Sequence, residues 1–136
     1  MSGGTSTLAE LIAAAAAARA NAYVPYSGFA VGAAIRDSGG ALHAGANVEN
    51  AAYPQGQCAE ASAIGAMIAA GGKRIVEMVV LADGDALCTP CGGCRQRIRE
   101  FAAPSTSIHI AGPEGLRRSF TLAELLPESL GPDNLA

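Results

Sequence analysis

The chain has 136 residues, which is the length of one ordinary domain with a core of its own. Its net charge of −3 and its small number of aromatic residues argue against a polynucleotide-binding surface, which carries basic patches and aromatic platforms, and favour a small-molecule partner. Half of the residues are hydrophobic and only 15% are charged, so we expect a single domain over residues 1–136 that assembles through apolar interfaces.

The first expected element is a helix that begins after Thr7 and ends before Pro25. Thr7 and Glu10 have the spacing of a capping box, and the alanine run that follows forms helix readily. The apolar segment 11–18 has no basic residue before it, unlike a secretory signal, and is too short to span a bilayer. We therefore expect a cytoplasmic protein without membrane contact.

Strands and helices alternate after this first helix. Runs of apolar and β-branched residues between glycine- and proline-marked turns predict strands, and longer amphipathic or alanine-rich segments predict helices. The expected elements are strands at 29–35 and 41–48, a helix at 58–70, a strand at 75–82, a helix at 91–101, strands at 107–111 and 116–121, and a short helix at 122–126.

The order of these elements predicts the fold class. A helix between the second and third strands, and another between the third and fourth, indicates crossover connections and a partly parallel sheet. The nearly continuous apolar run at 75–82 is typical of a strand covered on both faces. We predict a three-layer α/β/α domain with a mixed five-stranded sheet.

The residues that carry chemistry lie at two expected helix starts. Cys58-Ala59-Glu60 opens one helix, and Pro90-Cys91-Gly92-Gly93-Cys94 opens the other. Helix N-termini present unpaired N–H groups and a partial positive charge, which lower thiol pKa values and favour thiolate ligands. Three thiolates from two such starts hold one zinc ion and leave a fourth position for water, as in catalytic zinc sites.

Glu60 completes this arrangement. It lies two positions after Cys58, in the first turn of the helix, so that its carboxylate can reach a water at the metal without being a ligand. A metal that acidifies water and a carboxylate that carries protons are what a hydrolytic deaminase needs.

Cys88 leaves other interpretations open. The run from Cys88 to Cys94 contains two overlapping Cys-x-x-Cys steps, which with Cys58 are compatible with a closed four-cysteine structural zinc site, an iron–sulfur cluster or plain buried cysteines. Pro90 and the surrounding loop place Cys88 away from the helix start, and a closed site gives Glu60 no purpose. We therefore favour the catalytic arrangement, with a structural-zinc interaction module as the alternative.

Several segments together resemble the small homotetrameric zinc-dependent cytidine deaminases, whose signature pairs a Cys or His and a glutamate with a Pro-Cys-x-x-Cys element. The resemblance covers nearly the whole chain. The segments that carry it are Tyr26-Ser27-Gly28-Phe29-Ala30-Val31-Gly32-Ala33-Ala34, Asn47-Val48-Glu49-Asn50-Ala51-Ala52-Tyr53, Cys58-Ala59-Glu60, Pro90-Cys91-Gly92-Gly93-Cys94-Arg95-Gln96 and the tail from Leu125 to Leu135.

The resemblance implies a cytidine-deaminase-like fold and hydrolysis of free cytidine and deoxycytidine to uridine and deoxyuridine, with one Zn²⁺ per chain, a homotetramer and a place in pyrimidine salvage. A modified nucleoside or nucleoside antibiotic is the alternative substrate. The implied zinc ligands are Cys58, Cys91 and Cys94, with Glu60 as the catalytic proton carrier. The implied substrate-binding residues are Phe29, Asn47, Glu49, Tyr53 and the backbone of Ala59 and Thr89.

The residues themselves support part of the substrate assignment. Asn47 and Glu49 are two apart in an extended segment, so both side chains are expected to point the same way, and an amide with a carboxylate suits sugar hydroxyls. A solvated-loop interpretation remains open for this pair. For Phe29, an ordinary core aromatic remains an alternative to stacking on the base.

Two positions depart from the family pattern. Ala61 stands where many relatives have an arginine that offsets the thiolate charge, and Leu130 stands where the tail often has an aromatic. Three thiolates on Zn²⁺ leave a net charge of −1, so the helix termini or Arg95 must supply the compensation. Arg95 and Gln96 are expected to brace the site, with a solvent-facing role open for Arg95, and His43 and His109 to be structural or surface residues.

Overall fold

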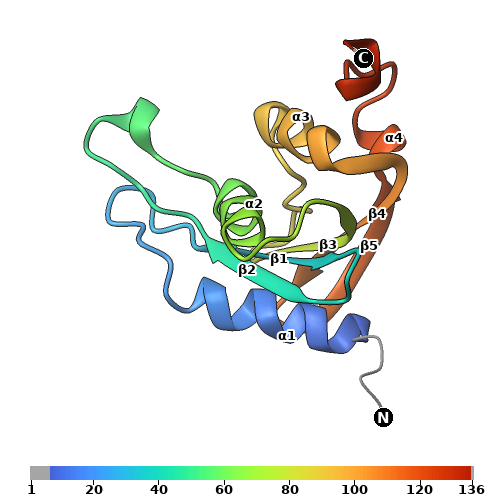
Figure 1. The fold of residues 1–136 in the computed structure, drawn as a ribbon. Coiled ribbons are helices and arrows are strands. Elements are labelled where there is room, and N and C mark those ends of the chain that lie inside the picture. The colour runs from blue at the N-terminus through green and yellow to red at the C-terminus, as the bar shows by residue number, and fades with distance from the viewer. Residues whose placement is uncertain (1–6, 136) are drawn as a thin grey trace.

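The computed structural model describes residues 7–135, which form a sheet covered by helices on both faces (Figure 1). The elements in chain order are α1 (Leu8–Arg19), β1 (Val31–Asp37), β2 (Leu42–Ala46), a 3-10 helix (Tyr53–Gln55), α2 (Ala59–Ala69), β3 (Ile75–Ala82), α3 (Gly92–Phe101), β4 (Ala102–Gly112), β5 (Gly115–Thr121), α4 (Leu122–Leu125) and a second 3-10 helix (Pro132–Asn134).

The sheet has five strands in the order β2-β1-β3-β4-β5. β1 pairs antiparallel with both β2 and β3, β3 pairs parallel with β4, and β4 pairs antiparallel with β5. The chain passes from β3 to the parallel strand β4 through α3, and adjacent parallel strands need a crossover connection of this kind. The predicted mixed five-stranded sheet is therefore confirmed.

The helices divide between the two faces of the sheet. α1 lies against one face, whereas α2 and α3 lie against the other (Figure 1). The apolar core is split in the same way. On the α1 face, Leu11 and Ala15 pack on Val79 and Leu81. On the other face, Met67 of α2 and Ile98 of α3 belong to a larger cluster over β1, β3 and β4.

Local sequence signals explain the helix ends. The predicted capping box is present, because the Thr7 side chain accepts from the Glu10 backbone N–H while the Glu10 carboxylate accepts from that of Thr7. Thr121 and Glu124 form a second capping box that starts α4. At the end of α2, Gly71 adopts φ of 95°, a left-handed conformation that favours glycine, and stops the helix where the sequence predicts.

The expectations for individual elements differ from the structure mainly at strand ends. β3 and the order of helices and strands are as predicted, whereas β1 starts at Val31 rather than residue 29 and β4 starts at Ala102 rather than 107. β4 follows α3 without a loop, and Pro104 lies inside it, where propensity disfavours a strand. Within residues 7–135, no helix is long and apolar enough to cross a membrane.

Candidate metal centre and active-site pocket

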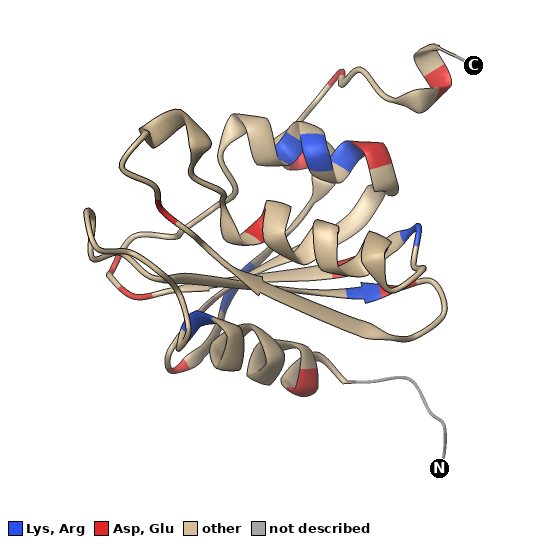
Figure 2. Ribbon diagram, turned by 60° about the vertical axis from the view of Figure 1, so that its left-hand side comes forward, with Lys and Arg blue, Asp and Glu red and all other residues tan. Residues whose placement is uncertain are grey.

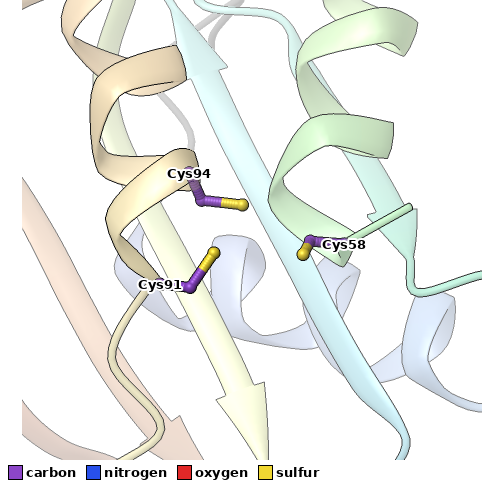
Figure 3. Close-up of side chains that lie close together, drawn as sticks. All are labelled: Cys58, Cys91 and Cys94. Atoms are coloured by element: carbon purple, nitrogen blue, oxygen red, sulfur yellow. The ribbon is translucent and has the colours of Figure 1, made fainter. Parts of the chain in front are cut away.

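Three cysteine side chains from two helix starts point toward one another on the α2–α3 side of the sheet (Figure 3). Cys58 is the N-cap of α2, Cys91 is the N-cap of α3, and Cys94 lies in the first turn of α3. Their Sγ atoms all lie within 4.8 Å of one another. Both caps have extended backbone angles, which let the sulfurs face a common point.

This donor set fits a zinc ion. A Zn–S bond of about 2.3 Å places two tetrahedral sulfur ligands about 3.8 Å apart, which is compatible with sulfurs that lie within 4.8 Å of one another. Cysteine thiolates are common zinc ligands, and three of them leave one tetrahedral position open. Cys58, Cys91 and Cys94 are therefore the residues that would hold the metal.

The electrostatics of the cluster also point to a cation. Burial raises the pKa of Cys58 and of Cys94, and the neighbouring negative groups raise both further. Only the pKa of Cys91 is lowered, chiefly because its sulfur accepts the backbone N–H of Cys94. Three thiolates side by side thus need a positive charge to neutralise them, which a dication supplies.

Cys88 lies near this cluster but outside it. Among the described residues, the group that could hold a metal contains three cysteines and not Cys88. Cys88 is half-buried, packs against the core and is close enough to Glu60 and Cys58 that, with burial, their negative charges raise the pKa of its thiol. The three-ligand arrangement therefore matches the geometry better than a closed four-cysteine site.

Glu60 is a buried carboxylate beside the cysteines. Its exposed fraction is 5%, and its burial raises the pKa of the side chain above the usual range for glutamate. In the described part of the chain its carboxylate hydrogen-bonds only to its own backbone N–H. A buried carboxyl group without a protein partner is a candidate for proton transfer to a bound molecule.

A small cavity joins the cysteines to the proposed substrate contacts. It has a volume of about 160 Å³. Six of its eight lining residues are site residues predicted from the sequence, and the other two, Val31 and Cys88, were not predicted to line a pocket. The lining consists of Val31, Asn47, Cys58, Ala59, Glu60, Cys88, Thr89 and Cys91.

Asn47 reaches this cavity from the segment that follows β2. Its Oδ1 accepts from the backbone N–H of Val31 at 3.0 Å, and its Nδ2 donates to the carbonyl of Phe29 at 2.9 Å. These two bonds fix the amide at the start of β1. One amide hydrogen and one lone pair of Asn47 stay available for a ligand.

Glu49 lines a separate hollow and not the cavity with the cysteines. This hollow has a volume of about 350 Å³ and is also lined by Tyr26, Ser27 and Tyr53. The backbone N–H groups of Tyr26 and Ser27 donate to Glu49 Oε1, and the Ser27 hydroxyl donates to Oε2, which lowers the pKa of this carboxyl. The structure therefore does not bring Asn47 and Glu49 into one cavity.

Tyr53 and Phe29 are more exposed than the cysteine cluster. Tyr53 is 74% exposed and forms an edge-on aromatic contact with Tyr26, with 5.8 Å between ring centroids. Phe29 is 44% exposed, so its interpretation as a core aromatic is wrong. Its carbonyl holds Asn47, and its ring is exposed beside the start of β1.

The hydrogen bonds of the arginine and glutamine candidates in α3, and of the two histidines, show where these side chains lie. Arg95 is half-buried and donates to Pro90, Leu125 and Thr89, so the solvent-facing alternative is wrong for this residue. Gln96 donates to the carbonyl of Leu130 at 2.9 Å. The two histidines lie elsewhere: His43 contacts Asp37, and His109 contacts Glu77 and Ser119, as expected for structural residues.

The residues that anchor Glu49 were not predicted from the sequence. Tyr26 and Ser27 belong to the first segment of the resemblance, but nothing in their spacing shows that a loop folds back onto position 49. Cys88 was not predicted to line the pocket, although its predicted loop position next to Thr89 was a signal for this placement.

Comparisons with known proteins agree with this geometry. Residues 5–110 match the family model described as the cytidine and deoxycytidylate deaminase zinc-binding region. The chain is 38% identical over 127 residues to a cytidine deaminase of Sporosarcina psychrophila, with 93% of each chain covered.

Solved structures show the same likeness. A crystal structure of cytidine deaminase from Burkholderia pseudomallei superposes with a TM-score of 0.86 at 37% identity and covers 92% of this chain and all of that one. One from Mycobacterium leprae gives a TM-score of 0.77 at 44% identity and covers 90% of this chain and 99% of the other.

Proposed function

The chain belongs to the cytidine and deoxycytidylate deaminase family, and on that premise we propose how its own residues carry out hydrolytic deamination. Its reaction is the zinc-dependent conversion of cytidine and water to uridine and ammonia. The observation that carries the proposal is the convergence of three cysteine sulfurs beside the buried carboxylate of Glu60, which has no hydrogen-bond partner from another described residue. Deoxycytidine, which gives deoxyuridine, belongs to the same proposal.

Cys58, Cys91 and Cys94 would hold the zinc ion. When bound, zinc supplies a Lewis acid that lowers the pKa of water toward neutrality. The helix starts that carry these cysteines direct their N–H dipoles at the cluster and stabilise its negative charge. Ala61 contributes no such compensation, because its side chain is uncharged.

Glu60 moves the protons of the reaction. It takes one proton from the attacking water and delivers it to ring nitrogen N3, so that oxygen adds at C4 while the ring nitrogen becomes protonated. It then passes the second proton of that oxygen to the amino group, whose bond to C4 breaks and which leaves as ammonia. Burial of Glu60 suits both steps, since a raised pKa lets the carboxyl group donate as well as accept.

The two hollows suit the two halves of a nucleoside. The cavity of about 160 Å³ beside Glu60 is below the range of about 300–1,000 Å³ for whole-ligand pockets, so it suits the pyrimidine ring alone. The backbone of Ala59 and Thr89 lines it and would contact the carbonyl and amino groups of the base.

The ribose then extends past Asn47 toward Glu49. Asn47 retains a donor for a sugar hydroxyl, and Oε2 of Glu49 has one acceptor position beyond its bond from Ser27. Tyr53 borders the same hollow, and Phe29 lies near the start of β1, where its ring can pack against the bound nucleoside.

The assembly proposed for the chain is a homotetramer, in the cytoplasm, that serves pyrimidine salvage. Five large apolar or aromatic side chains exposed around the nucleoside hollows support burial by further copies of the chain. They are Tyr23, Tyr26, Phe29, Val48 and Tyr53. Their exposure in one chain agrees with the apolar composition and few charges of the sequence.

A time course of cytidine absorbance with the zinc-loaded protein, with ammonia assayed in the same tube, tests the proposed function. We expect cytidine to be lost with an equal amount of ammonia released, and a chelator to abolish both. No turnover at one zinc per chain would contradict it. A panel of modified nucleosides in the same assay would then identify the alternative substrate, and absence of turnover throughout would leave the structural-zinc module.

A further inference from the structure

One arginine of α3 connects three parts of the chain around the metal centre. Arg95 follows Cys94 directly in sequence, and its backbone N–H donates to the carbonyl of Cys91 at 2.9 Å. Its side chain turns back past the start of the helix. Arg95 therefore contacts, through main chain and side chain, the segment that carries one of the three sulfur ligands.

All three nitrogen atoms of the Arg95 guanidinium are used. Nε donates to the carbonyl of Pro90 at 2.6 Å, and Nη2 donates to the hydroxyl of Thr89 at 3.1 Å. Nη1 donates to the carbonyl of Leu125 in α4 at 2.7 Å. The side chain is half-buried, so these bonds are only partly exposed to competition from water.

The other arginines of α3 have different roles. Arg99 donates to Ser129 and pairs with Asp133, so it holds the C-terminal tail and not the loop before Cys91. Arg97 is exposed and lies back along the helix toward Gly93. Figure 2 shows these basic residues together on one helix, although their partners differ.

We propose that Arg95 is a positioning residue of the deamination site, which fixes the Thr89–Pro90 segment against α4 and so aligns Cys91 and the Thr89 backbone with Glu60. This inference rests on the proposed function. It assigns to Arg95 a geometric role, because its guanidinium donates to two carbonyls and a hydroxyl, whereas a role through charge alone requires only a nearby cation.

A lysine at this position separates geometry from charge. Arg95→Lys keeps the positive charge but cannot reach three acceptors in three directions, because an ammonium lacks the planar fork of a guanidinium. Arg95→Ala removes both charge and bonds. Arg97→Ala removes a cation two positions away on the same helix, and Arg99→Ala removes the tail contacts, so these variants serve as matched controls.

The test measures the metal centre directly as well as turnover. For each variant we would record the rate of zinc release to a chelator, the absorption spectrum of the cobalt-substituted protein, and kcat and KM for cytidine. Loss of a residue that orients metal ligands typically costs about 10–100-fold in metal affinity or activity. We expect Arg95→Ala and Arg95→Lys to release zinc about tenfold faster, to shift the cobalt bands and to lower kcat more than they raise KM.

The controls are expected to keep zinc release, the cobalt spectrum and kcat within about twofold of wild type. Wild-type behaviour of Arg95→Lys would overturn the proposal, because charge alone would then suffice. So would unchanged metal properties and turnover in Arg95→Ala. If Arg95→Ala does not fold, Arg95→Lys decides the matter. Failure of the proposed function is recognised separately, since wild-type protein would then not deaminate cytidine although the cobalt spectrum still reports on Arg95.

Discussion

The two faces of the sheet both bury ionisable side chains, but they treat them differently. On the face covered by α1, His109 lies between Glu77 and Ser119, and Glu77 also pairs with Arg36. Each of these side chains has a partner within the sheet. On the opposite face, Glu60 is buried without a partner from another residue in the described chain, and the sulfurs beside it repel one another's charge.

This difference shows where a ligand is required. A buried ionisable group is stable when another protein group neutralises or hydrogen-bonds it, and it is costly when none does. On the α1 face, each of these ionisable side chains is paired with another protein group, although Arg36 Nε and Glu77 Oε1 make no hydrogen bond to the described residues. The α2–α3 face is incomplete until a metal and a substrate supply what the protein does not.

The largest expected effect comes from removing a ligand on the incomplete face. Cys91→Ala should lose zinc and lower turnover by about 100-fold or more, because even residues that only orient ligands contribute about 10–100-fold. Cys88→Ser is the matched control, since Cys88 lies outside the metal cluster and should keep one zinc per chain. Elemental analysis of both proteins provides the measurement, and zinc loss in Cys88→Ser with retention in Cys91→Ala would reverse the assignment.

Two glycines allow the helices on the two faces to be disturbed separately. A Cβ at Gly45 would lie 2.5 Å from the backbone nitrogen of Ala63 in α2, whereas one at Gly32 would lie 2.0 Å from the carbonyl oxygen of Ala15 in α1. Either alanine substitution should destabilise the fold by about 1–3 kcal/mol through overpacking. Only Gly45→Ala should also lower kcat/KM, by about tenfold, because α2 carries the proposed proton carrier.

Urea unfolding and cytidine turnover, both on zinc-loaded protein, distinguish these outcomes. A loss of kcat/KM in Gly32→Ala equal to that in Gly45→Ala would show that the two faces are not functionally separate. Such a result would contradict the division drawn from their buried groups.

A smaller, pH-dependent effect is expected at Asp37, a buried carboxylate that has the partners Glu60 lacks. The His43 ring and the backbone N–H groups of Gly39 and Ala41 hydrogen-bond to Asp37 and hold its pKa below the usual value of 3.8. A lowered carboxyl pKa stabilises the fold above pH 3.8, and this contribution is lost as the pH falls through the folded-state pKa.

Asp37→Asn should therefore cost about 1.5–3 kcal/mol near pH 6, the range for hydrogen bonds to a charged group, and less as the pH falls below about 4. The free energy of unfolding of both proteins, measured from pH 6 to pH 3, gives the difference. A difference that stays constant or grows toward pH 3 would show that the ionised carboxylate is not the stabilising species.

The sequence predicted the parts of this molecule that depend on local signals. The capping box at Thr7, the glycine stop after α2 and the apolar run of β3 each lie within one short segment, and each is confirmed. The clustering of Cys58, Cys91 and Cys94 was also predicted from local features, because each cysteine lies at a predicted helix start, where thiolates are favoured as metal ligands.

The rest depends on contacts between distant segments. Glu49 turns to the Tyr26–Ser27 loop because backbone N–H groups there need an acceptor. The two-residue spacing of Asn47 and Glu49 gives no information about that loop. Arg95 reaches Leu125 across about 30 residues of chain, so its partners are fixed by how α3 and α4 pack. β4 starts early because Ala102 pairs with Ile75, and Pro104 lies in the register shift between this pair and the pair Glu77–Ser107, where a proline is tolerated.

The most direct test of the contrast between the two faces compares one glutamate from each. Glu60→Gln and Glu77→Gln would be measured side by side at equal zinc content, for cytidine turnover per folded chain and for the free energy of unfolding. We expect Glu60→Gln to lose about 10²–10⁴-fold in turnover with the fold intact, and Glu77→Gln to lose about 3 kcal/mol of stability with turnover within about twofold of wild type. Near-normal turnover in Glu60→Gln, or a loss of turnover in Glu77→Gln as large as that expected for Glu60→Gln, would contradict the account.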